Sequence, residues 1–365
     1  MRQALALASL GFLACTPRAN ETSGLSGGSV AVSGSSAGDG STSSSTATTM
    51  SSVTAAETLT VGSDTSVTDG PKNDMGMPDL PQGSACNRKV DVVFVISQGG
   101  GVFEHLDALY ASYPAFIETM QETFAELDLH VMVVAADGDW GDASLCPASK
   151  CPADSGCPAY GDDNDFPCWA HHQDGALSDC DDRLGAGVVF PAGEDASNKP
   201  CDLSPGQRFL SGDDPLFAER FDCIARLGGT NGTHQNGWAL AEAVSPDLRA
   251  GCNAGFLRDD ALLFAILIAG KDESPYNYHA WAERALEAKD YEQELVVALG
   301  IADDWQASDP PLCEPGLPSD PVHEIYAWTR EFDHGFFGSV CAPSYAPYFT
   351  EAAQLAAELC EGAAR

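Results

Sequence analysis

The chain has 365 residues, of which 44% are hydrophobic and 20% are charged, so it holds enough apolar material for one sizeable core and a tail. It contains 18 Lys and Arg residues against 54 Asp and Glu residues, which gives a formal net charge of −36. A phosphate backbone or an anionic membrane surface would be repelled by this charge. Nucleic acid is therefore excluded as an expected partner.

The N-terminus predicts export. Arg2 is followed by an apolar run over residues 4–14, which is too short to anchor a protein in a bilayer and is typical of a signal peptide covering residues 1–14. The run ends in Phe-Leu-Ala-Cys at residues 12–15, which resembles a bacterial lipobox. This resemblance implies a lipid on Cys15, membrane contact only through that lipid, and a place in the outer membrane or at the cell surface. The alternative is a periplasmic or secreted protein with an incidental Cys15.

Residues 15–85 are dominated by Ser, Thr, Gly, Ala and Asp and contain hardly any aromatic residue. Such a segment cannot bury enough apolar area to offset its chain entropy, so it is predicted to be a disordered linker. With the flexibility of a Gly/Ser-rich chain, its root-mean-square reach is about 45 Å. The linker would hold a folded head away from a lipid-anchored N-terminus.

Cysteine usage also favours an oxidising compartment. Of the 13 cysteines, removal of Cys15 leaves twelve, enough for six disulfides. These candidates are Cys86, Cys146, Cys151, Cys157, Cys168, Cys180, Cys201, Cys223, Cys252, Cys313, Cys341 and Cys360. Six of them fall within residues 137–216 and are expected to link that segment to itself, leaving the other six for the core.

From residue 86 onward, strand and helix patterns alternate. Short β-branched and apolar runs predict strands, and apolar residues spaced by three and four predict helices. Pro114 is expected to kink or restart the first helix. The alternation indicates an α/β fold with a doubly wound, mainly parallel, Rossmann-like sheet. Strands are predicted at residues 89–96, 129–136, 261–268 and 294–301, and helices at residues 104–127, 278–289, 323–332 and 348–360.

Residues 137–216 form an insertion much longer than an ordinary connection and rich in Cys, Pro, Gly and Asp. Two interpretations stay open. The insertion is either a disulfide-held excursion without a role of its own or a binding surface, because long ordered loops above a scaffold commonly carry function.

Several segments in their order along the chain resemble the von Willebrand factor A (VWA)-like domains of bacterial secreted lipoproteins. They are residues 90–101, 221–237, 253–260 and 339–349, and the resemblance covers most of a domain at residues 86–362. It implies a Rossmann-like sheet whose binding rim lies at the carboxyl ends of the strands. It also implies a metal-ion-dependent adhesion site (MIDAS) at that rim.

The positions equivalent to the MIDAS ligands have lost their carboxylates. Ser97, Gly99 and Gly101 stand where the family has Asp-x-Ser-x-Ser, Thr230 fits the threonine of the second motif, and Gly270 takes the place of the third-motif aspartate. Magnesium needs hard oxygen ligands with one or two carboxylates to offset its dehydration. A degenerate MIDAS without a cofactor is therefore expected.

Neighbouring acidic residues leave Ca²⁺ or Mg²⁺ open as an alternative. Asp137 and Asp139 directly follow the second predicted strand, and Asp272 lies two residues beyond Gly270. Any of these carboxylates could substitute for a lost ligand, although acidic loops of this kind are usually only solvated and none has the full spacing of a known calcium loop.

The chain is not expected to be an enzyme, because it has no Gly-x-Ser-x-Gly elbow, no His-Glu-x-x-His and no P-loop. The expected function is that of an exported, lipid-anchored adhesion or binding protein, whose partner is a protein or glycan of the cell envelope. One alternative is a metal-dependent hydrolase that uses His171 and His172 in the insertion. Another is a purely structural envelope component.

Overall fold

The structure is a computed structural model that describes residues 86–99, 102, 105–136, 178–181, 183–191, 195–197, 199–229, 235–270, 277–305, 307–308, 310–313 and 324–361. All of these residues belong to one compact unit, residues 74–365. The predicted signal peptide, the lipidation site Cys15 and the predicted linker lie outside the described residues.

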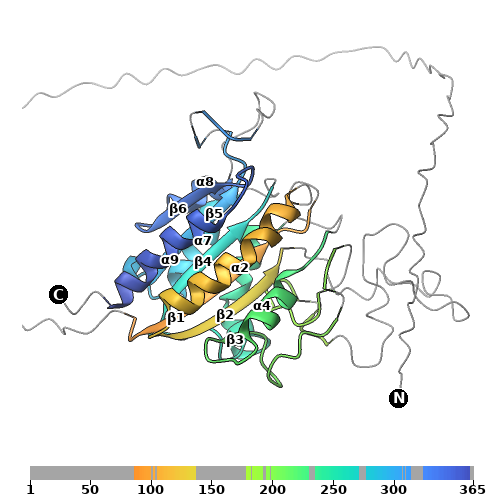
Figure 1. Ribbon diagram of the computed structural model, residues 1–365. Coiled ribbons are helices and arrows are strands. Elements are labelled where there is room, and N and C mark those ends of the chain that lie inside the picture. Colours follow the sequence, from red (N-terminus) through yellow and green to blue (C-terminus); the bar gives the residue numbers. More distant parts are fainter. Residues whose placement is uncertain are drawn as a thin grey trace, which may run out of the picture. The chain divides into compact units, whose positions relative to one another are not determined.

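A mainly parallel sheet forms the centre of the described part (Figure 1). Its six strands run in the order β3-β2-β1-β4-β5-β6, and every neighbouring pair is parallel except β2 with β3. This arrangement confirms the predicted α/β class and is compatible with a Rossmann-like fold. The strands are β1 (Lys89–Ile96), β2 (Asp128–Ala135), β3 (Leu210–Ser211), β4 (Leu262–Ile268), β5 (Val296–Ala302) and β6 (Gly335–Ser339).

Helices cover both faces of the sheet, which explains why the central strands are apolar throughout. All seven residues of β4 and all seven of β5 are buried. Seven α-helices occur in the described part: α2 (Leu106–Thr123), α4 (Phe217–Ala225), α5 (Asn236–Ala243), α6 (Pro246–Ala250), α7 (Tyr278–Glu287), α8 (Glu324–Thr329) and α9 (Ala346–Glu361).

The two faces have separate cores. On one face, Phe94 of β1 stacks on Phe116 of α2 and Phe349 of α9, with ring centroids 6.0 and 5.7 Å away. On the other face, Val93 and Val95 belong to a core that includes residues of α5, α7 and α8. Alternate residues of β1 therefore point to opposite cores, as the strand period of two requires.

Most predicted elements are confirmed within a few residues, with three differences. The first helix does not restart at Pro114, because α2 runs continuously through that residue. The helix predicted at residues 323–332 is shorter, since α8 ends at Thr329 and continues as a turn. Sequence patterns did not predict β3, β6 or the helices α4, α5 and α6.

Four disulfides occur among the described cysteines, and they support an oxidising compartment outside the cytoplasm. They join Cys86 to Cys360, Cys180 to Cys252, Cys201 to Cys223, and Cys313 to Cys341. Cys146, Cys151, Cys157 and Cys168 lie outside the described residues.

The expectation that the insertion is linked only to itself is wrong for Cys180 and Cys201. Both pair with cysteines beyond residue 216. The described half of the insertion is also part of the fold, because Gly187 bridges to Val134 of β2 and Val188 donates a backbone hydrogen bond of 2.8 Å to Val133. This half is therefore a flank of the sheet and not an excursion from it.

No helix in the described part of the chain is long and apolar enough to cross a membrane.

Candidate functional site

The strand order points to the carboxyl edge of the sheet between β1 and β4. After β1 the chain adds β2 and β3 on one side, and it then adds β4, β5 and β6 on the other. In open α/β sheets, ligands bind outside the carboxyl ends of the strands where the direction of winding reverses. This edge, called the rim below, is formed by the residues that directly follow β1 and β4.

Ser97 directly follows β1, and Gly270 lies two residues after the end of β4, so both belong to this rim. The backbone N–H of Ser97 donates to the carbonyl of Ile268 at 2.8 Å, which joins the ends of β1 and β4. The Ser97 side chain is buried, and its hydroxyl accepts a hydrogen bond of 3.3 Å from the backbone N–H of Gly99. Within the described rim, the predicted positions thus offer one hydroxyl and no carboxylate.

Gly101, Thr230, Asp137, Asp139, Asp272, His171 and His172 lie outside the described residues.

Two buried amide side chains near the rim were not predicted. Gln98 is 2% exposed; its Nε2 donates to the carbonyl of Leu227 at 3.1 Å, while its Oε1 has no hydrogen-bond partner. Asn236, the first residue of α5, is 1% exposed, and its Oδ1 also has no partner. A buried polar atom without a partner costs free energy and calls for an explanation such as a bound water, ion or ligand group.

Helix α5 brings Asn236 to the carboxyl edge of the sheet. The backbone N–H of Gln235, directly before the helix, donates to the carbonyl of Ala136 at the end of β2 at 2.9 Å. Asn236 precedes the core residues Ala239 and Leu240 by three and four positions, so it shares their sheet-facing side. The sequence holds no clear signal for either amide, because Gln98 lies between Ser97 and Gly99 and Asn236 follows a polar segment.

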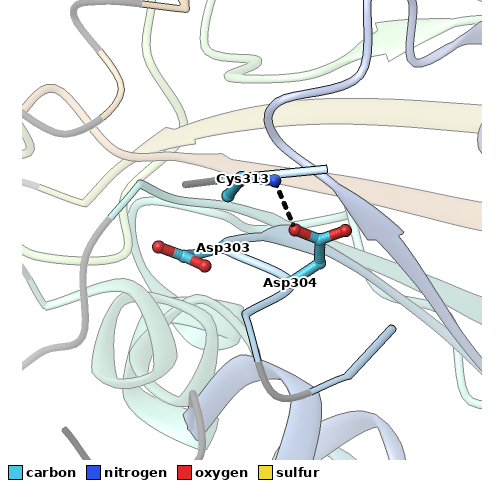
Figure 2. Close-up of side chains that lie close together, drawn as sticks. All are labelled: Asp303, Asp304 and Cys313. Carbon is cyan, nitrogen blue, oxygen red and sulfur yellow. Dashed lines mark hydrogen bonds between the residues drawn. The ribbon is translucent and has the colours of Figure 1, made fainter. Parts of the chain in front are cut away.

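A third group of side chains follows the carboxyl end of β5 (Figure 2). Asp303, Asp304 and Cys313 place their ligand atoms within 4.8 Å of one another, and no other described residues form such a group. Their spacing would suit a metal ion. The sequence analysis did not consider the two aspartates.

The bonding of these side chains argues against a metal centre. The sulfur of Cys313 is bonded to Cys341 and cannot be a thiolate ligand. Asp304 is fully buried, and its two carboxylate oxygens each accept a backbone hydrogen bond of 2.9 Å, one from Leu312 and one from Cys313. Figure 2 shows the bond from Cys313. Asp303 accepts from the backbone of Trp305 at 2.9 Å. Asp304 therefore fastens the loop after β5, next to the Cys313–Cys341 disulfide.

The opposite, amino edge of the sheet is closed by charged groups. Asp91 of β1 is fully buried and accepts hydrogen bonds of 2.7 and 2.8 Å from the backbone and the guanidinium of Arg258. Burial raises the pKa of Asp91 despite these contacts. Lys289 donates to the carbonyls of Arg258 and Ala261 at 2.7 Å each, and burial lowers its pKa to about 8. The charged side chains at the amino edge already have partners within the protein, so the rim is the better candidate for a ligand-binding site.

Neither the models of known protein families nor the curated proteins give a match to this sequence.

Proposed function

We propose that this chain is an exported, lipid-anchored, VWA-like binding protein of the bacterial cell envelope, and that it binds a protein or glycan at the rim without a complete MIDAS. The observation that carries the proposal is the reversal of winding between β1 and β4, where the backbone of Ser97 after β1 is hydrogen-bonded to Ile268 of β4. The absence of a carboxylate from the predicted positions in the described rim supports a metal-independent mode of binding.

The position of Cys86, the first described residue, also supports the proposal that the domain is displayed on a linker. Cys86 lies before the amino end of β1 and is joined to Cys360 near the end of α9. The first described residues therefore lie at the edge of the sheet opposite the rim, which favours display of the rim by a linker attached before residue 86.

Site-directed photocrosslinking in envelope preparations tests binding at the rim. A photoreactive residue in place of Gly270 should capture one specific protein or glycan, whereas the same residue in place of Gln354, which is exposed on α9, should not. Equal capture from both positions, or none from Gly270, would contradict the proposal.

Lipid anchoring has its own test. The protein should partition into detergent and carry a lipid on Cys15, and Cys15→Ala should move it to the aqueous phase. Mass spectrometry that finds an unmodified N-terminus beyond residue 15 would refute the anchor and leave rim binding untouched.

Magnesium tests the degenerate MIDAS. Millimolar Mg²⁺ should leave the melting temperature of the unmodified protein unchanged. The combined substitution Ser97→Asp, Gly99→Ser, Gly101→Ser and Gly270→Asp should create a stabilisation that grows with the Mg²⁺ concentration. A Mg²⁺-dependent rise in the unmodified protein, abolished by Thr230→Ala or Asp272→Ala, would show that neighbouring residues rebuild the site.

A further inference from the structure

A cavity of about 500 Å³ lies outside β2, on the flank of the sheet that the second half of the insertion forms (Figure 1, green loops beside β2 and β3). The flank is held to β2 by the bridge between Gly187 and Val134 and by the pairing of β2 with β3. The cavity volume is within the range of about 300–1,000 Å³ that small-ligand sites occupy. Its place is separate from the boundary between β1 and β4.

Two disulfides give the cavity a fixed shape. Cys180 and Cys252 both line it and are bonded to each other. Cys201, which lies between the lining residues Pro200 and Asp202, is bonded to Cys223 of α4. A cavity whose walls are fixed before binding spends less free energy on ordering when a ligand enters.

The only cation among the lining residues is already paired. Arg208 donates to the carbonyl of Gly187 at 2.5 Å and to the hydroxyl of Ser178 at 3.3 Å, and it forms an ion pair with the buried Asp181. Its donors are therefore engaged within the protein, and it offers little to an anionic ligand.

Three polar side chains that line the cavity are without partners in the described structure. Asp202, Ser204 and Gln207 line the cavity, and their side chains make no hydrogen bond or ion pair in the described structure. Asp202 is exposed and carries the one unpaired charge among the lining residues. The other walls are largely apolar, with Val189, Phe190, Pro200, Leu203 and Pro205.

We propose that this cavity binds a cationic group carried on an apolar stem, an ammonium or guanidinium such as a Lys or Arg side chain of a polypeptide. The carboxylate of Asp202 would pair with the cation, Ser204 and Gln207 would accept its hydrogen bonds, and the apolar walls would cover the stem. The net charge of −36 attracts such a ligand and repels an anionic one. This site is independent of the rim.

Capped tripeptides test the proposal on the purified, oxidised full chain at low salt. The probes are Ac-Ala-X-Ala-NH₂ with X as Lys, Arg, norleucine or Glu, and the readout is the shift of the backbone amide resonances of Gly206 and Gln207. The Lys and Arg peptides should bind more tightly than the norleucine peptide, which has a similar stem without the charge. Cadaverine, a free diamine, tests whether the peptide backbone contributes.

The matched variants are Asp202→Asn and Asp213→Asn. The first removes the charge at the cavity and is tolerated by the backbone, because Asn adopts the left-handed conformation that Asp202 has at φ 49°. The second removes the same charge at an exposed aspartate of the neighbouring segment that does not line the cavity. Asp202→Asn should weaken binding of the Lys peptide by about two- to five-fold, the range expected for an exposed ion pair, and Asp213→Asn should leave it unchanged.

Three results would overturn the proposal. Equal binding of the Lys and norleucine peptides would remove the role of the charge. Equal weakening by both variants would show only general attraction to an acidic protein. Tighter binding of the Glu peptide would make Arg208 the anchor. Binding of the Lys peptide and of cadaverine would assign recognition to the ammonium alone, and binding of the peptide without cadaverine would assign it to a polypeptide side chain.

Discussion

Substitution of Asp304 tests whether its carboxylate holds the loop after β5 through hydrogen bonds or binds a metal ion. Its carboxylate is fully buried and accepts two backbone hydrogen bonds of 2.9 Å. Each hydrogen bond to a charged group contributes about 1.5–3 kcal/mol, so the loss of both in Asp304→Ala should lower the free energy of unfolding by about 3–6 kcal/mol. Asp304→Asn keeps one acceptor oxygen and should cost about half as much.

Asp303→Ala serves as the matched control. Asp303 accepts only one hydrogen bond, from Trp305, and is only half-buried, so its loss should cost about 1 kcal/mol. Urea denaturation of the three variants under non-reducing conditions, with and without EDTA, measures these differences. A metal centre would predict a similar cost for both aspartates and a loss of stability on chelation. An equal cost of Asp303→Ala and Asp304→Ala, or a loss of stability of the unmodified protein in EDTA, would refute the proposed role of Asp304 in holding the loop.

Three further predictions concern the fold. Folded Lys289 has a pKa of about 8 and the unfolded side chain one of about 10.5, so the unfolded state binds more protons between these pH values. The free energy of unfolding should therefore rise by about 2 kcal/mol from pH 7 to pH 9.5. Urea titrations at different pH values measure this rise, which should vanish in Lys289→Met. Replacing Cys86 and Cys360 by Ala opens a loop with a sequence separation of 274 and should lower the free energy of unfolding by about 4 kcal/mol, whereas an unchanged urea midpoint would refute the contribution of this disulfide. Gly237→Ala would place a Cβ 1.8 Å from the Trp281 ring, so it should cost at least about 2 kcal/mol in a thermal melt, and a neutral result would contradict this packing.

Elements that depend on local pattern were predictable from the sequence, and elements that depend on distant packing were not. The bounds of β1 match its prediction, because an apolar run of this length has to be buried on both faces. β6 was missed because its two glycines disfavour a strand. The structure explains both glycines, since a Cβ on Gly335 would lie 1.8 Å from the carbonyl oxygen of Thr329 and one on Gly338 would lie 2.3 Å from the Tyr348 ring.

The candidate site also combines features that local sequence pattern predicts with features that depend on distant contacts. The place of Ser97 and Gly270 at the rim follows from the position of each residue directly after a predicted strand. The buried amide of Gln98 could not be predicted, because the carbonyl that it contacts belongs to Leu227, 129 residues away. The role of Asp304 likewise depends on the fold of the loop that returns at Leu312 and Cys313.

The four disulfides lie where the sheet itself provides little support. The central strands are buried on both faces and pair along their full length, so the hydrophobic cores hold them without covalent help. Each disulfide instead involves a loop or the end of the unit: the entry of the chain at Cys86, the loop after β5 at Cys313, and the flank with the cavity at Cys180 and Cys201. Irregular loops have few backbone hydrogen bonds and open at low free-energy cost unless they are tied down. Cross-links at these places therefore do more to fix the shape of the surfaces around the sheet than to stabilise the sheet, and that is where a binding protein needs rigidity.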